Sequence, residues 1–414
     1  MIFSFVIIFL LHLLTLTNGY LTLEQSSLIN DDVSESTKIS LNLKETIEIV
    51  DRNVEEFLIY NDLPSIVFGI SIKNKTIYKS AKGMIDIENN IQANIGAIYR
   101  IASVTKNFVS TYFGTLVDQK KVQYEDSIYK HLPVDAYPKK FFNKKPVDIT
   151  IGQLLSHMAG LHITNITDYY NLFYPANSTE SLKPFQNEDL HFAPGTDWIY
   201  SNYGYRILGA IIEHIVKLPF PVAMNKFLHE TLKLSSETSI ETLGTLLHHH
   251  LRPKYYRQSS KNQTIPVGTF DDIAFLSGIW PAGGLQSNID DLLLYGNLLI
   301  DSYHQRSNSI LMKETLTQIW TKRTMNAPSF PKFLRSTSEY GYGWAITHIS
   351  DDNPKHLKHR DAVWHNGGMM GVSTFFIIYP KEEVVVAAMT NKGSISGLEH
   401  LCIDSMELLY DFIS

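Results

Sequence analysis

Strand-like segments lie near both ends of this chain, and a long region of helical periodicity separates them. Rich in β-branched and aromatic residues, the strand-like segments are 65–72, 76–82, 341–349, 372–379 and 383–391. Apolar residues at helical spacing precede the first segment, over 43–58, and follow the last, over 396–413. Because strands and helices bury their apolar faces against one another, this order predicts one α/β lobe built from both chain ends, with an inserted helical lobe roughly within 103–335.

The inserted region has the periodicity of helices joined by loops. The expected helices are 108–117, 151–157, 205–218 and 292–300. Ser287, followed three residues later by Asp290, has the pattern of an N-cap before the last of these helices. Since no repeat and no low-complexity tract divides the sequence, we expect a single domain over 42–414.

Composition excludes several classes of protein. Of the 414 residues, 44% are hydrophobic and 19% are charged, which is typical of a globular chain and not of a disordered or collagen-like one. The 36 Lys and Arg stand against 42 Asp and Glu, a net charge of −6, so we expect no nucleic-acid partner. A single cysteine, Cys402, excludes an internal disulfide, and its apolar surroundings favour a buried thiol over a nucleophile.

The first residues have the pattern of a targeting segment. The run from Ile2 to Leu16 is mostly apolar, too short for a comfortable membrane span and long enough for the core of a signal peptide. We therefore expect a signal peptide over 1–19, a flexible leader over 20–41, and a protein that is secreted or in the secretory lumen. The first basic residue is Lys38. This lack of positive charge leaves an uncleaved membrane anchor open and disfavours a mitochondrial presequence.

Four N-glycosylation sequons favour the secretory route. They begin at Asn74, Asn165, Asn177 and Asn262. One sequon alone arises easily by chance, but four sequons together with the apolar leader predict a glycoprotein.

Ser103 and Lys106 form an S-x-x-K motif just before the apolar run 108–117. On a helix, residues three apart share a face, so the hydroxyl and the amine can meet. A lysine that burial keeps neutral could accept the serine proton. The two other matches, Ser127–Lys130 and Ser329–Lys332, show that the motif alone is weak, and their polar or proline-containing surroundings indicate surface positions.

Tyr200 and Asn202 form a Y-x-N motif between a Pro-Gly loop and an expected helix. A phenol can share in proton transfer and an amide can hold a substrate carbonyl. Junctions between loops and helices also commonly carry function. Two further matches, Tyr169–Asn171 and Tyr295–Asn297, leave a structural tyrosine as the alternative.

The segment from His365 to Gly368 contains the one H-x-G motif of the sequence, ahead of the strand-like run 372–379. Its glycines permit close backbone approach, and an exposed amide there could face a developing oxyanion. A glycine turn with a surface histidine is the alternative. The consecutive histidines 248–250 cannot easily converge on one ion, so we expect a solvated loop there and no metal site.

The order S-x-x-K, Y-x-N, H-x-G, with the segments around these motifs, resembles the serine β-lactamase-related family. The matching segments are Arg100–Lys106, Leu154–Leu161, Tyr200–Tyr205, Pro281–Leu285, Tyr342–Trp344 and His365–Gly368. Within this family the chain is most similar to the class C enzymes and to the animal serine β-lactamase-like proteins. The resemblance implies a two-lobed β-lactamase/transpeptidase-like fold of the α/β (α+β) class, in which an antiparallel sheet is flanked by N- and C-terminal helices and joined to the helical lobe.

Carried over residue by residue, the resemblance implies a set of catalytic roles. Ser103 would be the nucleophile that accepts the acyl group, and Lys106 and Tyr200 would share the general acid and base work. The backbone N–H groups of Ser103 and Gly368 would form the oxyanion hole.

The same resemblance implies that Asn202, His365, Gly367 and Gly368 contact the substrate. His365 stands where β-lactamases usually carry lysine, and an imidazole of ordinary pKa, about 6.5, is mostly uncharged at neutral pH. We therefore expect a preference for substrates without a free carboxylate, and better binding of carboxylate-bearing substrates when acid charges His365. His157, in the family's Leu-Leu-Ser-His pattern, is expected to be structural.

The resemblance implies a serine hydrolase that acts through an acyl-enzyme on peptides or esters, with no metal and no organic cofactor. The alternatives are a true β-lactamase, and a non-catalytic scaffold or filament-forming pseudoenzyme. The expected partner is a small-molecule, peptide or ester substrate. A membrane contact is expected only if the leader is uncleaved. Whether the chain forms a homo-oligomer is left open.

Overall fold

The computed structural model describes residues 42–163, 175–242, 245, 251–261, 263–267, 270–323, 338–347 and 361–412. Several expectations lie outside the described residues: the signal peptide and leader over 1–41, the sequons at Asn165 and Asn262, Tyr169, Ser329 and the histidines 248–250. Residues 43–414 form one of the two units into which the chain divides, and the architecture below is that of this unit.

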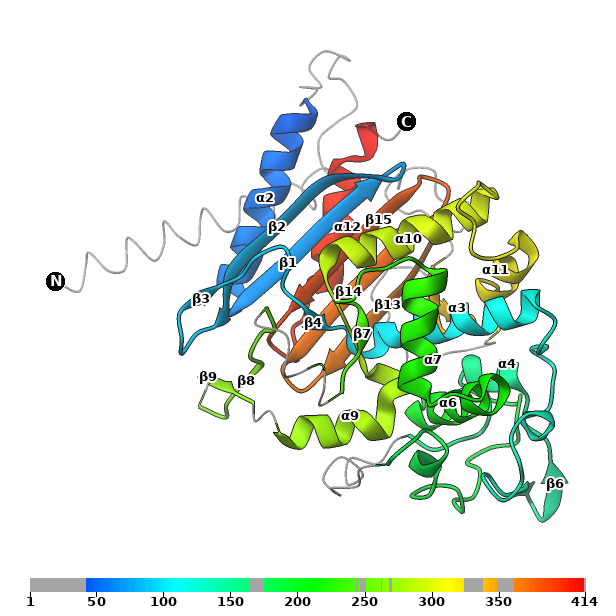
Figure 1. Ribbon diagram of the computed structural model, residues 1–414. Helices are drawn as coiled ribbons and strands as arrows, with labels where there is room; N and C mark the ends of the chain where they lie inside the picture. Colours follow the sequence, from blue (N-terminus) through cyan, green and yellow to red (C-terminus); the bar gives the residue numbers. More distant parts are fainter. Residues whose placement is uncertain are drawn as a thin grey trace, which may run out of the picture. The chain divides into compact units, whose positions relative to one another are not determined.

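An eight-stranded antiparallel sheet forms the α/β lobe, and both ends of the chain contribute to it (Figure 1). In spatial order its strands are β11 (Ser338–Tyr340), β12 (Ala345–Thr347), β13 (Ala362–Met369), β14 (Val372–Tyr379), β15 (Val384–Thr390), β1 (Ser65–Ile72), β2 (Lys75–Asp86) and β3 (Ile91–Gln92). The neighbours β15 and β1 join the two chain ends, with Ile66 opposite Thr390 and Ile72 opposite Val384. The predicted fold class is confirmed.

Helices cover both faces of this sheet, so its strands bury side chains on both sides (Figure 1). The covering helices are α2 (Leu43–Tyr60) and α12 (Leu398–Leu408) on one face and α10 (Ile289–His304) on the other. In β14, Phe375 and Ile377 join the core under α2 and α12, whereas Phe376 and Ile378 join the core on the α10 side. This alternation follows from the two-residue period of a strand, and two covered faces explain why the strand reads as a continuous apolar run.

The chain between β3 and β11 is mainly helical. Its longer elements are α3 (Thr105–Asp118), α4 (Ile151–Leu155), α6 (Asn202–Val216), α7 (Phe220–Lys226), α9 (Phe270–Gly283), α10 and α11 (Lys313–Ile319). Short strands accompany them: β4 (Tyr99–Arg100), β5 (Lys140–Phe142), β6 (Lys145–Val147), β7 (Ser239–Ile240), β8 (Tyr256–Gln258), β9 (Thr264–Pro266) and β10 (Leu285–Ser287). Single turns of 3-10 or π helix lie at Ala102–Val104, Ile128–Lys130, Glu180–Leu182, Phe227–Thr231 and Tyr410–Phe412. Because α3 packs against α6, α9 and α11, it lies in the middle of this region.

Some boundaries differ from the sequence-based expectations for local reasons. The N-cap of α10 is Asn288, one residue after Ser287, because the Asn288 side-chain oxygen accepts the Asp291 N–H at 2.8 Å. The expected strand 341–349 is interrupted, since the chain turns through Gly343 with a φ of 76° between β11 and β12. The H-x-G segment lies inside β13 and not in a turn.

The most apolar helices of the chain are packed inside the molecule. In α6, ten residues from Tyr203 to Ile212 are buried. Within the described ranges, no single helix has the length and apolar character needed to cross a membrane, although α6 and Phe220–Thr231, bent by 76°, meet that test as a pair.

Candidate active site

Ser103 lies at a strained turn between a buried strand and a buried helix. Between β4 and α3, Ala102 has a φ of 46°, in the left-handed region. This conformation costs a non-glycine residue roughly 1–2 kcal/mol, so the surrounding packing must hold the turn in place. Ser103 is partly exposed whereas Ala102 and Val104 are buried. The turn therefore leaves the serine accessible at an otherwise buried position.

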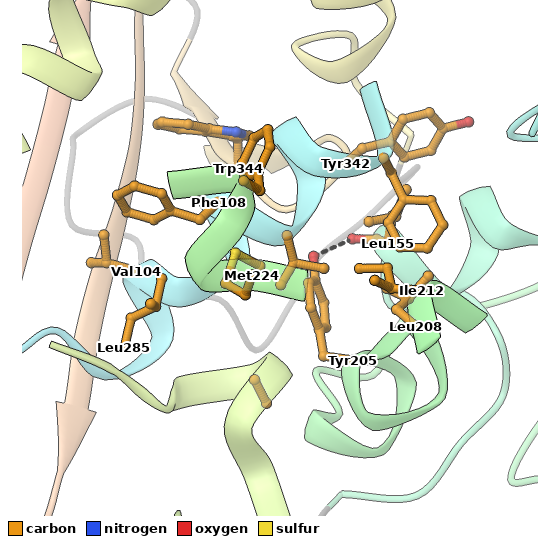
Figure 2. Close-up of a cluster of buried hydrophobic side chains, with 14 of the residues drawn as sticks. Val104, Phe108, Leu155, Tyr205, Leu208, Ile212, Met224, Leu285, Tyr342 and Trp344 are labelled. Carbon is orange, nitrogen blue, oxygen red and sulfur yellow. Dashed lines mark hydrogen bonds between the residues drawn. The ribbon is translucent and has the colours of Figure 1, made fainter. Parts of the chain in front are cut away.

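The packing of α3 fixes the position of Ser103 relative to the rest of the fold. Figure 2 shows Val104 and Phe108, at the start of this helix, in a cluster with Leu285 and Trp344. Phe108 also stacks on Tyr295, with ring centroids 3.9 Å apart. Truncating a buried phenylalanine to alanine costs about 3–5 kcal/mol, so such contacts hold the helix firmly.

The amine of Lys106 is buried and surrounded by three oxygen atoms. Its Nζ lies 3.1 Å from Ser103 Oγ, 2.8 Å from Asn202 Oδ1 and 2.7 Å from the backbone oxygen of Ala282. Burial lowers the pKa of Lys106 well below its ordinary value, because an ammonium loses its hydration in these surroundings. The site therefore favours a neutral amine.

The number of protons on this amine decides which way the hydrogen bond to Ser103 runs. A neutral amine has two N–H donors and one lone pair. The side-chain oxygen of Asn202 and the carbonyl of Ala282 only accept, so they take both N–H groups. The lone pair of Lys106 then faces Ser103 Oγ at 3.1 Å, within reach for proton transfer.

Tyr200 and Asn202 flank Ser201, the N-cap of α6. The Ser201 Oγ accepts the Tyr203 N–H at 3.3 Å, so the helix begins at Asn202. This arrangement brings the Asn202 side chain to Lys106 and places the centroid of the Tyr200 ring 4.9 Å from its Nζ. The structure thus brings the S-x-x-K and Y-x-N motifs together.

The strand β13 brings the H-x-G glycines to the same place. It pairs with β14 along most of its length but, among the described residues, with β12 only over Ala362–Trp364. A Cβ on Gly367 would lie 2.2 Å from the backbone oxygen of Ile101, so only glycine permits this contact with the turn before Ser103. Gly368 is exposed, and a Cβ there would meet no described atom within 4 Å. Within the described residues, this part of the edge of β13 is not paired with another strand and lies next to the turn before Ser103.

His365 lies in the wall of the site, but its ring nitrogens bond to protein atoms. Its Nδ1 is 2.6 Å from the Asn366 carbonyl oxygen and its Nε2 is 3.0 Å from the Tyr340 hydroxyl. The residue is 1% exposed. Burial is the main cause that lowers the pKa of His365 to about 3. The expectation that His365 keeps an ordinary pKa near 6.5, and so becomes charged in mild acid, is therefore wrong.

Sequence reasoning missed Tyr340 entirely. This residue ends β11, is fully buried, and belongs to none of the three motifs. Its hydroxyl lies 3.3 Å from the Nε2 of His157, whose Nδ1 accepts the Ser201 N–H at 3.2 Å. Burial is the main cause that lowers the pKa of His157 well below its ordinary value. The one signal for this part of the site was the Leu-Leu-Ser-His pattern that includes His157.

The other described matches to the motifs have structural surroundings. Ser127 donates to Asp148 at 2.6 Å while Lys130 bonds to Asp126 at 2.7 Å, so this serine and lysine have separate partners. The buried residues of Tyr295–Asn297 lie within α10 and form part of the core. These positions do not join the candidate site.

A groove of about 1150 Å³ passes beside Gly367 and Gly368 and offers space for a ligand. Charged residues of both signs line it: Asp62, Arg257, Lys392 and Glu399. The described part of the chain contains no group of three or more His, Cys, Asp or Glu side chains placed to hold a metal ion.

This fold and this site define a β-lactamase/transpeptidase-like protein. A family model described as Beta-lactamase matches residues 50–401. The chain belongs to the Beta-lactamase family, as the order of its three motifs predicted.

Individual proteins show the same relationship at low identity. The human mitochondrial serine beta-lactamase-like protein LACTB is 22% identical over 408 residues, covering 81% of this chain and 72% of that protein. The octameric penicillin-binding protein homologue from Pyrococcus abyssi superposes with a TM-score of 0.71 at 22% identity, covering 88% of this chain and 77% of its own. EstCE1, a hydrolase with promiscuous acyltransferase activity, also gives 0.71, at 20% identity, with 87% and 98% covered.

Proposed function

We propose that this protein is a serine hydrolase that forms an acyl-enzyme at Ser103 with a peptide or ester substrate. The observation that carries the proposal is the buried amine of Lys106, 3.1 Å from Ser103 Oγ, with both of its N–H groups engaged elsewhere. When this amine is neutral, as its lowered pKa favours, it can act only as a proton acceptor toward the serine. It thereby meets the requirement of an activated nucleophile with an adjacent base.

The reaction follows from this arrangement in two halves. Ser103 Oγ attacks the substrate carbonyl carbon as its proton passes to Lys106 Nζ, and the carbonyl oxygen becomes an oxyanion. The bond to the leaving group then breaks, and the leaving group takes a proton through Tyr200, whose ring lies beside Nζ. Water attacks the resulting ester, releases the acid and returns a proton to Ser103 Oγ, so the enzyme is regenerated.

Backbone N–H groups are the proposed stabilisers of the oxyanion. Gly368 follows Gly367 on β13 and Ser103 follows Ile101 on the facing turn, so the close contact between Gly367 and Ile101 brings these two backbone segments near each other. Donors preorganised in this way commonly contribute a large part of catalysis, because charge develops where they already point. Asn202, which bonds to Lys106, is the proposed contact for the substrate amide.

The neutral state of His365 favours substrates without a carboxylate beside the scissile bond. The imidazole stands where β-lactamases usually carry lysine, and a pKa of about 3 leaves it uncharged at neutral pH. Both ring nitrogens also have protein partners, so this residue supplies no free cation. Esters and internal peptide bonds are therefore the proposed substrates in preference to β-lactams.

Labelling with a fluorophosphonate probe tests the proposal. The wild type should be labelled, Ser103→Ala should lose labelling by roughly 10³-fold or more, and Ser127→Ala should be labelled like the wild type. Undiminished labelling of Ser103→Ala would refute the nucleophile. A folded wild type that no probe labels and that hydrolyses no ester would favour the alternative of a non-catalytic scaffold.

We also propose that the protein enters the secretory pathway, on the strength of the leader over 1–19 and the four sequons. Expressed in animal cells, it should reach the medium or the secretory lumen and lose mass on treatment with a glycosidase. Import into mitochondria without a glycan would overturn this proposal.

A homo-oligomer is proposed by analogy with the octameric homologue, and light scattering on the purified chain tests it.

A further inference from the structure

Four hydrogen bonds run in one line from the N-cap of α6 to β13. The Ser201 N–H donates to His157 Nδ1 at 3.2 Å, and His157 Nε2 lies 3.3 Å from the Tyr340 hydroxyl. That hydroxyl lies 3.0 Å from His365 Nε2, and His365 Nδ1 lies 2.6 Å from the carbonyl oxygen of Asn366. The line joins the helical region to the strand edge that lies beside the proposed nucleophile.

The backbone groups at the two ends fix the direction of this line. An amide N–H can only donate, so His157 Nδ1 carries no proton, and its Nε2–H donates to the oxygen of Tyr340. A carbonyl can only accept, so His365 carries its proton on Nδ1, and its Nε2 accepts the proton of the Tyr340 hydroxyl. The Ser201 N–H and the Asn366 carbonyl therefore require the same direction of donation along the line. This direction is possible only if both imidazoles are neutral.

A neighbouring tyrosine does not change the order. Tyr205 also bonds to the Tyr340 hydroxyl; when Tyr205 donates this bond, Tyr340 keeps its proton for His365, and the Leu155 backbone oxygen, 3.0 Å from the Tyr205 hydroxyl, keeps the Gly343 N–H as its donor. If Tyr340 donated to Tyr205 instead, His365 would have to carry its proton on Nε2. Its Nδ1 lone pair would then face the Asn366 carbonyl oxygen at 2.6 Å, which is repulsive.

The surroundings keep this line dry and neutral. His157, Tyr340 and His365 are 3%, 0% and 1% exposed. Buried hydrogen-bonded groups are costly to leave unpaired, so the three side chains hold one another in place. Burial lowers the pKa of both histidines, in agreement with two neutral rings.

We propose that Tyr340 and His365 are positioning residues, whose one-way hydrogen-bond line fixes the peptide between Asn366 and Gly367 and thereby the glycine edge of β13. Glycines leave a backbone free to rotate, and β12 does not pair with this part of the strand in the described residues. β14 pairs with this segment on one edge, so the restraint from His365 acts on the edge that β12 leaves unpaired. Its effect on catalysis rests on the proposed hydrolase function, whereas the order of the protons does not.

The first experiment measures which ring nitrogen of each histidine carries the proton, and it does not depend on enzymatic activity. In a chain labelled with 15N-histidine, His157 should show the neutral Nε2–H form and His365 the neutral Nδ1–H form between about pH 5.5 and 8, around the ordinary imidazole pKa. Tyr340→Phe removes the hydroxyl and keeps the ring, so the His365 proton should stay on Nδ1 while the 15N signal of Nε2 shifts, because Nε2 loses its hydrogen-bond donor. A wild-type His365 that titrates in this range, or that carries its proton on Nε2, would overturn the proposal.

The second experiment separates the two bonds of His365. In His365→Asn the side-chain amide can replace Nδ1 as the donor to Asn366, whereas His365→Gln reaches Tyr340 and loses that donor. We expect His365→Asn to be labelled by the fluorophosphonate within about tenfold of the wild-type rate, the worth of one hydrogen bond. His365→Gln and Tyr340→Phe should be labelled roughly 10- to 100-fold more slowly.

The matched control is Tyr295→Phe, which removes another buried hydroxyl, bonded to Thr111 at 2.7 Å and outside the site. It should be labelled at the wild-type rate, and thermal unfolding should show all four variants folded. Equal losses in His365→Asn and His365→Gln, or wild-type labelling of Tyr340→Phe, would refute the positioning role. Labelling that Ser103→Ala abolishes but Tyr340→Phe leaves unchanged would refute this inference while the proposed function stands.

Discussion

The backbone oxygen of Ala282 lies 2.7 Å from the Nζ of Lys106, closer than the 3.1 Å between that amine and Ser103 Oγ. Ala282 is in the last turn of α9, where carbonyl groups have no N–H partner within the helix. The last turn of this helix therefore accepts a hydrogen bond from one of the two N–H groups of a neutral Lys106. The lone pair of the amine is then left for Ser103, so the end of a helix contributes to the proposed chemistry.

The first prediction concerns the cost of burying Lys106. Because burial lowers its pKa, the unfolded chain holds one proton more than the folded chain between the lowered pKa and the ordinary pKa of about 10.4. The free energy of unfolding should therefore rise with pH below about 10, by up to about 1.4 kcal/mol per unit from this group. Lys106→Met removes that contribution and lowers hydrolysis by roughly 10³-fold or more. Urea unfolding of both proteins from about pH 8 to 10 measures the difference in slope.

The control for this measurement is Lys130→Met. Lys130 is 59% exposed and bonds to Asp126, so water reaches its amine in the folded and the unfolded chain. Its variant should keep the pH slope of the wild type. If Lys106→Met keeps that slope as well, Lys106 is not neutral in the folded protein and the proposed base is wrong.

The second prediction concerns a buried ion cluster close to the serine turn. Glu241 is fully buried, its Oε2 lies 2.7 Å from Arg100 Nε, and Arg252 also bonds to it. Although burial raises the pKa of Glu241, the charges of Arg100 and Arg252 lower it below its ordinary value. Glu241→Gln leaves two buried guanidinium groups without their anion, so the free energy of unfolding should fall by about 3–5 kcal/mol at pH 7.

The pH dependence of this loss has a definite sign. A lowered carboxyl pKa stabilises the fold above the ordinary pKa, and this stabilisation disappears as the pH falls through the lowered value. The difference between the wild type and Glu241→Gln should therefore shrink in acid. Asp290→Asn, which removes an exposed partner of Lys79, should cost about 0–1 kcal/mol in the same urea titration. If the two variants lose the same free energy of unfolding, the buried cluster stabilises the fold no more than an exposed ion pair does.

The sequence predicted the residues that carry local chemistry better than those that orient them. Ser103 and Lys106 are three residues apart, so a helical turn alone brings them together. The Asn202 oxygen reaches the same amine across 96 positions of sequence, whereas the family resemblance implied only a contact between Asn202 and the substrate. Tyr340 reaches His365 through the pairing of β11, β12 and β13, which no local pattern encodes.

The pKa of His365 is a second property that the sequence alone could not predict. An imidazole in a sequence has its ordinary pKa near 6.5, and the expectation of a pH-dependent charge followed from it. The structure buries the ring beside Lys106, and that environment depends on strands and helices far apart in the chain. Burial of this kind can be read only from the folded protein, because it needs every covering element in place.

The third prediction follows from that corrected pKa. With a pKa of about 3, His365 stays neutral over the range in which an ordinary histidine would titrate. The ratio of kcat/KM for an ester to kcat/KM for its carboxylate-bearing analogue should therefore be flat between about pH 5.5 and 8. Comparing two substrates on one enzyme cancels the titration of Lys106 and Tyr200. A ratio that shifts toward the carboxylate substrate in acid, in the wild type but not in His365→Gln, would contradict this prediction. It would show that His365 becomes charged in this pH range.

The last prediction ranks the two sequons that the structure describes. Asn74 and Thr76 are both exposed at the turn between β1 and β2, which gives a glycosylating enzyme access, although the Asn74 Nδ2 donates to Asp301 Oδ1 at 2.8 Å and this bond must open first. Asn177 is half-buried, and its side-chain oxygen accepts the Glu180 N–H at 2.7 Å. Ser178 beside it is 1% exposed, so little space exists for a sugar.

If the protein is secreted, Asn74 should therefore be glycosylated and Asn177 should not. Asn74→Gln should lower the mass of the secreted protein by one glycan, and Asn177→Gln should leave that mass unchanged. Mass spectrometry before and after glycosidase treatment measures both variants against the wild type. A glycan at Asn177 with none at Asn74 would contradict the argument from exposure, because the half-buried asparagine would then have been the better acceptor. A wild type without any glycan would instead contradict the proposal of secretion, and the ranking of the two asparagines would fall with it.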